Sequence, residues 1–203
     1  MTGRLLRRDQ GQAFPIYVMM VAGLLFLALA FFAVGKASAL RNEAQGAADA
    51  SALAAAQSAR KQFEAPFIAA LWTNSIDVFL RASPFYAACG AAQGLASAND
   101  ADLTSCVPVE GGKRDTITTT VRGLGAVDSP VLPGSDEKHA STEATAIIEF
   151  RCSWKAVDLN DDGVMDIYFF TCGDAGMIEI RPSSPPPWPS VSKILFDVHL
   201  VDQ

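Results

Sequence analysis

The sequence has few of the residues and motifs that enzymes use. It contains two histidines in 203 residues, and it contains no nucleophile motif, no phosphate-binding loop and no metalloprotease helix. His139 lies in a polar stretch that is typical of an exposed loop, and His199 alternates with apolar residues near the end of the chain. We therefore expect no catalytic residue, no enzymatic activity and no small-molecule substrate.

The cysteines are also few, and they lack the spacing of a zinc site. No pair is C-x2-C, and neither histidine lies at ligand spacing from a cysteine. An even number of cysteines that all follow a long apolar run favours disulfides in an oxidising compartment, with buried free thiols as the alternative. The four are Cys89, Cys106, Cys152 and Cys172.

Positive charge is scarce after the first residues. Residues 1–13 carry a net charge of +2, whereas the rest of the chain carries −8. Nucleic acids and anionic lipids select positively charged surfaces. The acidic remainder argues against both as ligands, so we expect no nucleic-acid partner; it is compatible with cation binding.

Residues 14–35 form an uninterrupted uncharged run. A helix of that length is roughly 33 Å long, which is enough to cross a bilayer core of about 30 Å. Arg4, Arg7 and Arg8 on its short N-terminal side predict a cytoplasmic tail over residues 1–13 and an extracytoplasmic domain. The alternative is a cleaved signal, for which residues 37–39 offer an A-x-A pattern, but the run is longer than a usual signal core. We expect a single-pass protein of the cell membrane.

The segment that follows the run is rich in alanine. Residues 36–62 contain no proline, and alanine has the highest helix propensity. Small residues recur there at steps of three and four, which lets another helix approach closely. The positions that we expect to pack against a partner helix are Ala44, Ala48, Ser51, Ala52 and Ala55. The alternative is a plain helical stalk, and we expect the helical part to extend to residue 82.

Two strings flank the apolar run. Residues 9–13 read DQGQA before it, and residues 47–56 read AADASALAAA after it. Together they resemble the N-terminal module of the Flp pilus-assembly TadE/TadG-like family, over roughly residues 8–60. The resemblance implies a membrane-anchored, non-enzymatic component of Flp-type pilus assembly or Tad secretion, such as a minor pilin-like or pseudopilin-like subunit. It also implies contacts of the N-terminal helix with other membrane proteins of that apparatus.

Residues 83–203 are expected to form the extracytoplasmic domain. Composition predicts a loop over residues 87–112 and extended polyproline over residues 183–190. From about residue 115 onward, β-branched and aromatic residues predict a small antiparallel sheet. The expected fold class is α+β, with one transmembrane helix continuing into an alanine-rich helix, followed by a small disulfide-bonded β domain.

The sharpest local motif is an acidic loop over residues 158–166. Its D-x-N-x-D-G-x-x-D spacing is that of calcium loops, in which oxygen ligands converge and a glycine permits the turn. Phe169 stands where an EF-hand requires glutamate, and the flanks favour strands. The expected ligands of a structural calcium ion are Asp158, Asn160, Asp162, the carbonyl of Val164, and Asp166. The alternative is an acidic solvated turn.

The cysteines around this loop predict a hairpin. Cys152 and Cys172 are placed symmetrically about residue 162, so they face each other across antiparallel strands and can form a disulfide. Cys89 then pairs with Cys106 by elimination. With such a stiffened domain, the alternative function is a membrane-tethered surface binding module.

Overall fold

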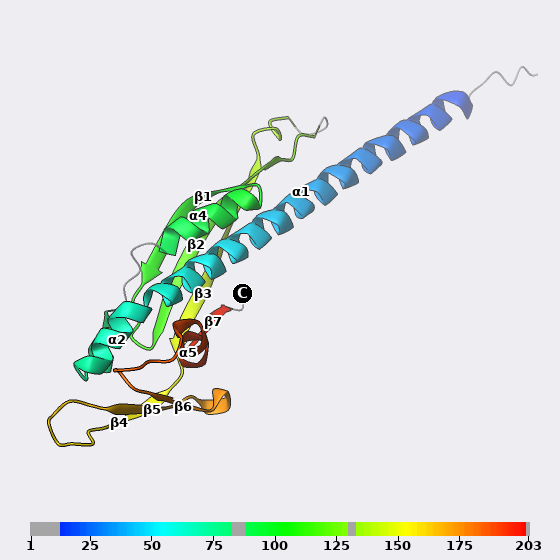
Figure 1. Ribbon diagram of the computed structural model, residues 1–203. Coiled ribbons are helices and arrows are strands. Elements are labelled where there is room, and N and C mark those ends of the chain that lie inside the picture. Colours follow the sequence, from blue (N-terminus) through cyan, green and yellow to red (C-terminus); the bar gives the residue numbers. More distant parts are fainter. Residues whose placement is uncertain (1–12, 83–87, 130–132, 202–203) are drawn as a thin grey trace, which may run out of the picture.

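A single long helix organises the structure. A computed structural model describes residues 13–82, 88–129 and 133–201. Helix α1 (Ala13–Gln62) carries the rest of the chain on its C-terminal half and extends beyond it on the other side (Figure 1). The expected basic tail and the first residues of the DQGQA string lie outside the described residues.

The length of α1 follows from its composition. Alanine dominates its second half, and no proline occurs between Pro15, in the first turn, and Pro66. Its 50 residues correspond to about 75 Å. The helix runs unbroken through residues 35 and 36, so the expected membrane segment and the first part of the expected stalk, up to residue 62, are one element.

A four-stranded antiparallel sheet packs against the C-terminal half of α1. Its strand order is β1-β2-β3-β7. Helix α4 (Ala88–Ala98) lies beside α1 and contacts β1, so two helices cover one face of this sheet (Figure 1). On the opposite face Val107 and Val109 are half exposed. The strands are β1 (Ala101–Val109), β2 (Arg114–Ala126), β3 (His139–Phe150) and β7 (Phe196–Leu200).

A smaller antiparallel sheet lies at the end of the domain far from the free end of α1. Its strand order is β4-β5-β6, and it packs through aromatic side chains against the short helices. Phe67 is the centre of this cluster, in ring contact with Phe79, Phe170, Trp188 and Phe196. The remaining elements are α2 (Glu64–Trp72), α3 (Ile76–Arg81), β4 (Ser153–Val157), β5 (Ile167–Thr171), η1 (Gly173–Ala175), β6 (Met177–Ile180) and α5 (Trp188–Leu195).

The expected fold class is confirmed: a long N-terminal apolar helix is followed by an antiparallel domain with two disulfides. Two local expectations are wrong. The segment expected as a loop over residues 87–112 forms helix α4 and strand β1. The expected polyproline stretch ends early, because Trp188 and Pro189 begin helix α5, whose first turn tolerates proline.

Candidate functional site

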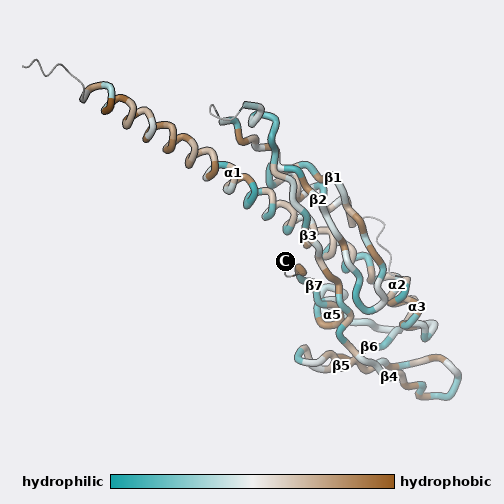
Figure 2. Tube along the Cα trace, turned by 180° about the vertical axis from the view of Figure 1, so that it is seen from behind, coloured by the Kyte–Doolittle hydropathy of each residue, from teal (hydrophilic) through white to brown (hydrophobic). Residues whose placement is uncertain are grey.

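The N-terminal half of α1 is a bare apolar surface. Within the part of the chain that the structure describes, it belongs to the one helix long and apolar enough to cross a membrane. Figure 2 shows this half mostly in the colours of hydrophobic residues, away from the sheets. Exposed phenylalanines occur along it: Phe14, Phe26, Phe31 and Phe32 are each more than half exposed. Such a surface is stable in lipid, so this half is suited to cross a membrane.

The alanine face of α1 is buried inside the chain itself. Ala44, Ala48, Ser51, Ala52 and Ala55 are each at most 2% exposed. Helix α4 and strands β2 and β3 cover them. Small residues do permit close approach, as expected, but the approaching elements belong to the same chain. The expectation that a partner helix docks on these five positions is therefore corrected.

One hydrogen bond fixes α1 on the sheet at this face. The Thr119 hydroxyl on β2 donates to the Ala48 carbonyl at 3.1 Å, and both groups are buried. The buried Ser51 hydroxyl finds its acceptor within α1 itself, since it donates to the Ala47 carbonyl at 2.7 Å. A threonine hydroxyl that reaches a helix carbonyl requires a short helix–sheet distance, which explains why alanine and serine fill these positions.

Two glycines on β2 extend the close approach toward the membrane end. A Cβ built on Gly123 would lie 3.6 Å from the Ala44 Cβ. At Gly125 a Cβ would overlap the Leu40 side chain. Sequence reasoning missed both positions, although a glycine inside a strand pattern indicates a close backbone approach.

An open groove lies beside this contact. It has a volume of about 790 Å³ and runs between α1, the turn after α4 and the end of β2. Glu43 and Asp100 line it, together with exposed Leu124 and Gly46. Gly46 faces outward, and a Cβ built there meets no atom within 4 Å. The groove belongs to the part of α1 that the sheet and α4 leave uncovered.

The acidic loop joins β4 and β5 as expected, and it is closed by its own hydrogen bonds. The Asp158 carboxylate accepts from the Gly163 N–H at 2.8 Å and from the Asn160 N–H at 3.2 Å. The Asp166 carboxylate accepts from the Leu159 N–H at 2.8 Å. The Asp162 carboxylate accepts from the Val164 N–H and the Asn160 amide. Asp161 and Gly163 have positive φ, which the turn requires.

These hydrogen bonds favour the charged form of Asp158. The backbone donors, first that of Gly163, lower the pKa of Asp158 below its ordinary value. The Asp158 carboxylate is therefore ionised at neutral pH. Among the described residues, no three His, Cys, Asp or Glu side chains stand close enough together to hold a metal ion.

Both disulfides join the pairs that the sequence argument predicts. Cys152 and Cys172 close the β4–β5 hairpin at the end opposite the acidic loop, and both are almost completely buried. Cys89 on α4 and Cys106 on β1 are partly exposed and tie the helix to the edge strand. The two bridges thus stabilise different parts of the domain.

The fold and these surfaces define a class: a membrane-anchored α+β protein whose anchoring helix also forms the core of its domain. Comparison with known protein families finds a match in that helix. Residues 11–58 match the Tad family model of Flp pilus-assembly TadE/G-like proteins, so the expected resemblance is confirmed in family and in position. No curated protein and no solved structure matches the chain. The match ends within α1 and leaves both sheets outside it.

Proposed function

We propose that this protein is a membrane-anchored, non-enzymatic component of Flp-type pilus assembly or Tad secretion that serves as a minor pilin-like or pseudopilin-like subunit. The supporting observation is the position of the family match. It covers the apolar half of α1 and the alanine-rich half that packs on the sheet. Proteins of this family contribute to assembling pili, and their common part is here the element that anchors the chain.

Assembly contacts of such a subunit use the surfaces of α1 that its own domain leaves free. These are the apolar half and the exposed strip around Asn42, Gly46 and Gln57. The buried alanine face instead keeps the domain fixed on the helix. The domain then faces the extracytoplasmic side, as the basic N-terminal residues predict.

Crosslinking of the full-length protein in its native membrane, followed by mass spectrometry, tests this function. We expect pilin, pilus-assembly membrane proteins or a secretion ATPase in the crosslinked material. The Gly46→Trp variant tests whether the exposed strip of α1 makes these contacts. Its bulky side chain points outward into the groove, and it should reduce the crosslinks without unfolding the domain. Recovery of the protein alone, from properly inserted material, contradicts an assembly role.

A tethered binding module is the second candidate, and one observation favours it. The tip of the acidic loop presents Leu159, which is 67% exposed, at the end of the domain far from the anchor. This function predicts crosslinks to wall-processing proteins only. It also predicts that the isolated membrane helix is replaceable by another anchor.

We further propose that residues 158–166 bind calcium in a structural role. The ionised Asp158, the ligand spacing and the glycine turn support this proposal. Binding requires Asp158, Asp162 and Asp166 to draw together, because they accept backbone hydrogen bonds separately in the described loop.

Thermal unfolding of the full-length protein in detergent tests the calcium site. We expect a higher melting temperature in millimolar calcium than in chelator, since extracellular modules bind calcium with Kd of about 10⁻⁴–10⁻³ M. Asp162→Asn should abolish the difference. Asp174→Asn, which removes an exposed acid outside the loop, should preserve it. Equal melting temperatures of the unmodified protein in calcium and chelator would show that the loop is only an acidic turn.

A further inference from the structure

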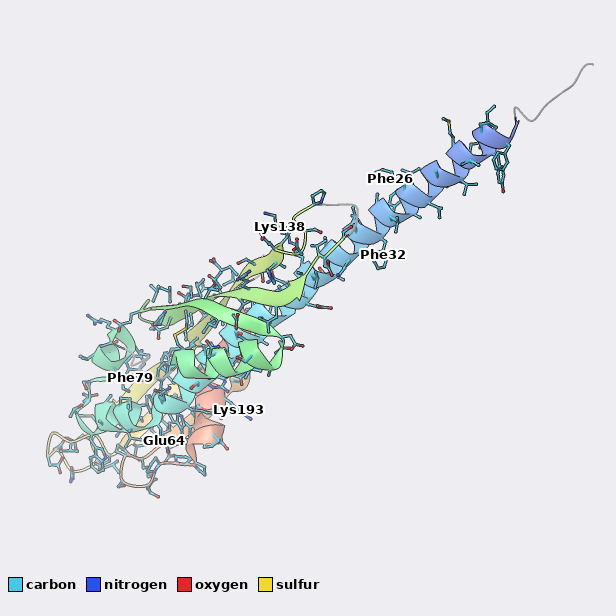
Figure 3. The ribbon with its side chains drawn as sticks, turned by 90° about the horizontal axis from the view of Figure 1, so that it is seen from above. Phe26, Phe32, Glu64, Phe79, Lys138 and Lys193 are labelled. Atoms are coloured by element: carbon cyan, nitrogen blue, oxygen red, sulfur yellow. A yellow bond between two sulfur atoms is a disulfide. The ribbon has the colours of Figure 1, made fainter. Side chains whose placement is uncertain are left out.

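The β2–β3 hairpin extends along α1 toward its apolar half. Figures 1 and 2 both show the hairpin beside the helix, beyond the end of the other strands. In Figure 3, Lys138 lies on the hairpin beside α1, on the domain side of Phe32. The domain therefore reaches the height at which the helix enters the membrane.

The position of the hairpin can be estimated along the helix axis. Gly125 on β2 lies against Leu40 of α1. Leu40 follows Gly35, the last residue of the uncharged run, by five residues, or about 7.5 Å of helix. The interfacial region on each side of a bilayer core is about 5–7 Å thick.

The contact of the sheet with α1 begins close to the end of the apolar run. Leu40 is partly buried and Ala44 is buried, whereas Ala37 on the same helix face is exposed. The uncharged run over residues 14–35 spans roughly 33 Å, enough to cross a bilayer core of about 30 Å. The hairpin beyond Gly125 is thus level with the layer just outside the hydrocarbon.

The described residues on either side of the hairpin turn, 127–129 and 133–138, are built to lie in a polar interface. Ser135 is 7% exposed, and its hydroxyl accepts from the Ser129 N–H at 2.7 Å and donates to the Ser129 carbonyl at 3.2 Å. The Ser135 carbonyl accepts from the N–H groups of Asp128 and Lys138. These backbone groups are satisfied without water, which suits the boundary of a membrane.

Charged side chains limit how deeply the hairpin can enter the bilayer. Asp128, Asp136, Glu137 and Lys138 are all exposed. Ionised carboxylates are strongly disfavoured in hydrocarbon, and a mixture of both signs matches the zwitterionic headgroup layer. An anionic leaflet would repel three carboxylates.

We propose that the β2–β3 hairpin rests in the zwitterionic headgroup layer of the bilayer that α1 spans. The domain then touches the membrane at two points, the helix and the hairpin. This contact sets the height of the domain and restricts its tilt. The inference rests on membrane anchoring by α1 and on no pilus partner.

Fluorescence quenching in liposomes of phosphatidylcholine tests the contact. Single cysteines, labelled with an environment-sensitive fluorophore, are introduced into the full-length protein at Glu137, Glu110 or Leu27. Glu110 is the matched control, because it is an exposed acid on the β1–β2 turn at the opposite end of the same sheet. Leu27 reports anchoring itself, since it lies in the apolar half.

We expect a nitroxide on the lipid headgroup to quench the label at Glu137→Cys several-fold more than the label at Glu110→Cys. A nitroxide on the acyl chain should quench the label at Leu27→Cys. Quenching at residue 27 with equal, weak quenching at residues 137 and 110 overturns the hairpin contact but not the anchor. Absence of quenching at residue 27 overturns the anchor and the hairpin contact with it.

Discussion

Tyr168 shows how one polar group joins the smaller sheet to helix α2. It lies on β5, and its side chain is completely buried. Its hydroxyl donates to the Leu71 carbonyl at the end of α2, at 2.7 Å, and lies 3.2 Å from the Asn74 amide oxygen. Leu71 is separated from Tyr168 by almost a hundred residues, so this hydrogen bond could not be predicted from the sequence.

Tyr168→Phe is expected to destabilise the domain by about 0.5–1.5 kcal/mol, because it removes the buried hydrogen bond to the Leu71 carbonyl, which keeps only the Asn74 N–H as a donor. Burial raises the pKa of the Tyr168 hydroxyl. Its contribution to stability is therefore complete below the unfolded pKa of about 10 and is lost as the pH rises through the folded pKa. Urea unfolding at pH 7 and at pH above 10 measures both effects. If the variant and the unmodified protein lose the same stability in alkali, Tyr168 is not the titrating group.

At the scale of elements, α1 carries two kinds of surface that look similar in the sequence. The alanine positions at steps of three and four are indistinguishable, by pattern alone, from a site for a partner helix. The tertiary fold decides between the two kinds of surface, and here α4 and the sheet of the same chain cover the alanine face.

Two substitutions two residues apart on α1 separate these surfaces. Ala48→Leu overfills the contact with β2 and is expected to cost about 1–3 kcal/mol. Gly46→Ala places its methyl in open space and is expected to gain roughly 0.5–1 kcal/mol from helix propensity. Urea unfolding of both variants in detergent measures the difference. Tolerance of leucine at residue 48 would contradict the intramolecular packing of this face.

Other elements show which parts of the fold could be predicted from the sequence and which could not. The apolar run, the hairpin and both disulfides follow from local pattern and symmetry. Helix α4 was missed because Gly90, Gly94 and Ser97 suggested a loop, although Ala88, Ala92 and Ala96 recur at helical spacing on its buried face. Strand β1 was missed because the small and polar residues of the same segment also suggested a loop. Because it contains a proline, Pro108, it also has no strong strand pattern. At a sheet edge the absent N–H of proline has no cost, and edge position is a property of the tertiary fold.

At the scale of the whole molecule, the disulfides divide the domain into a protected end and an accessible side. Cys152–Cys172 is enclosed by β4, β5 and α5, whereas Cys89–Cys106 joins two elements at the sheet edge. Each bridge restricts the unfolded chain, and removal of such a bridge typically costs 2–5 kcal/mol.

Mild reduction of the folded protein is expected to open Cys89–Cys106 first, because a reductant reaches its partly exposed sulfurs without unfolding. Cys152–Cys172 should open only under denaturing conditions. Alkylation of the released thiols and peptide mass spectrometry identify the pair at each time. Earlier release of Cys152 and Cys172 would mean that the second sheet opens more readily than the sheet edge.

The unbroken course of α1 has a mechanical consequence. A rod that is at once the anchor and the core of the domain transmits torque and axial displacement without a hinge. A helix turns by about 100° and rises by 1.5 Å per residue. A single residue inserted at residues 36–39, before the sheet contact begins, therefore rotates the whole domain by about 100° about the membrane normal while changing its height very little. The number of residues in this short stretch therefore sets the rotation of the domain about the membrane normal, and it determines which side each molecule shows to its neighbours in the membrane.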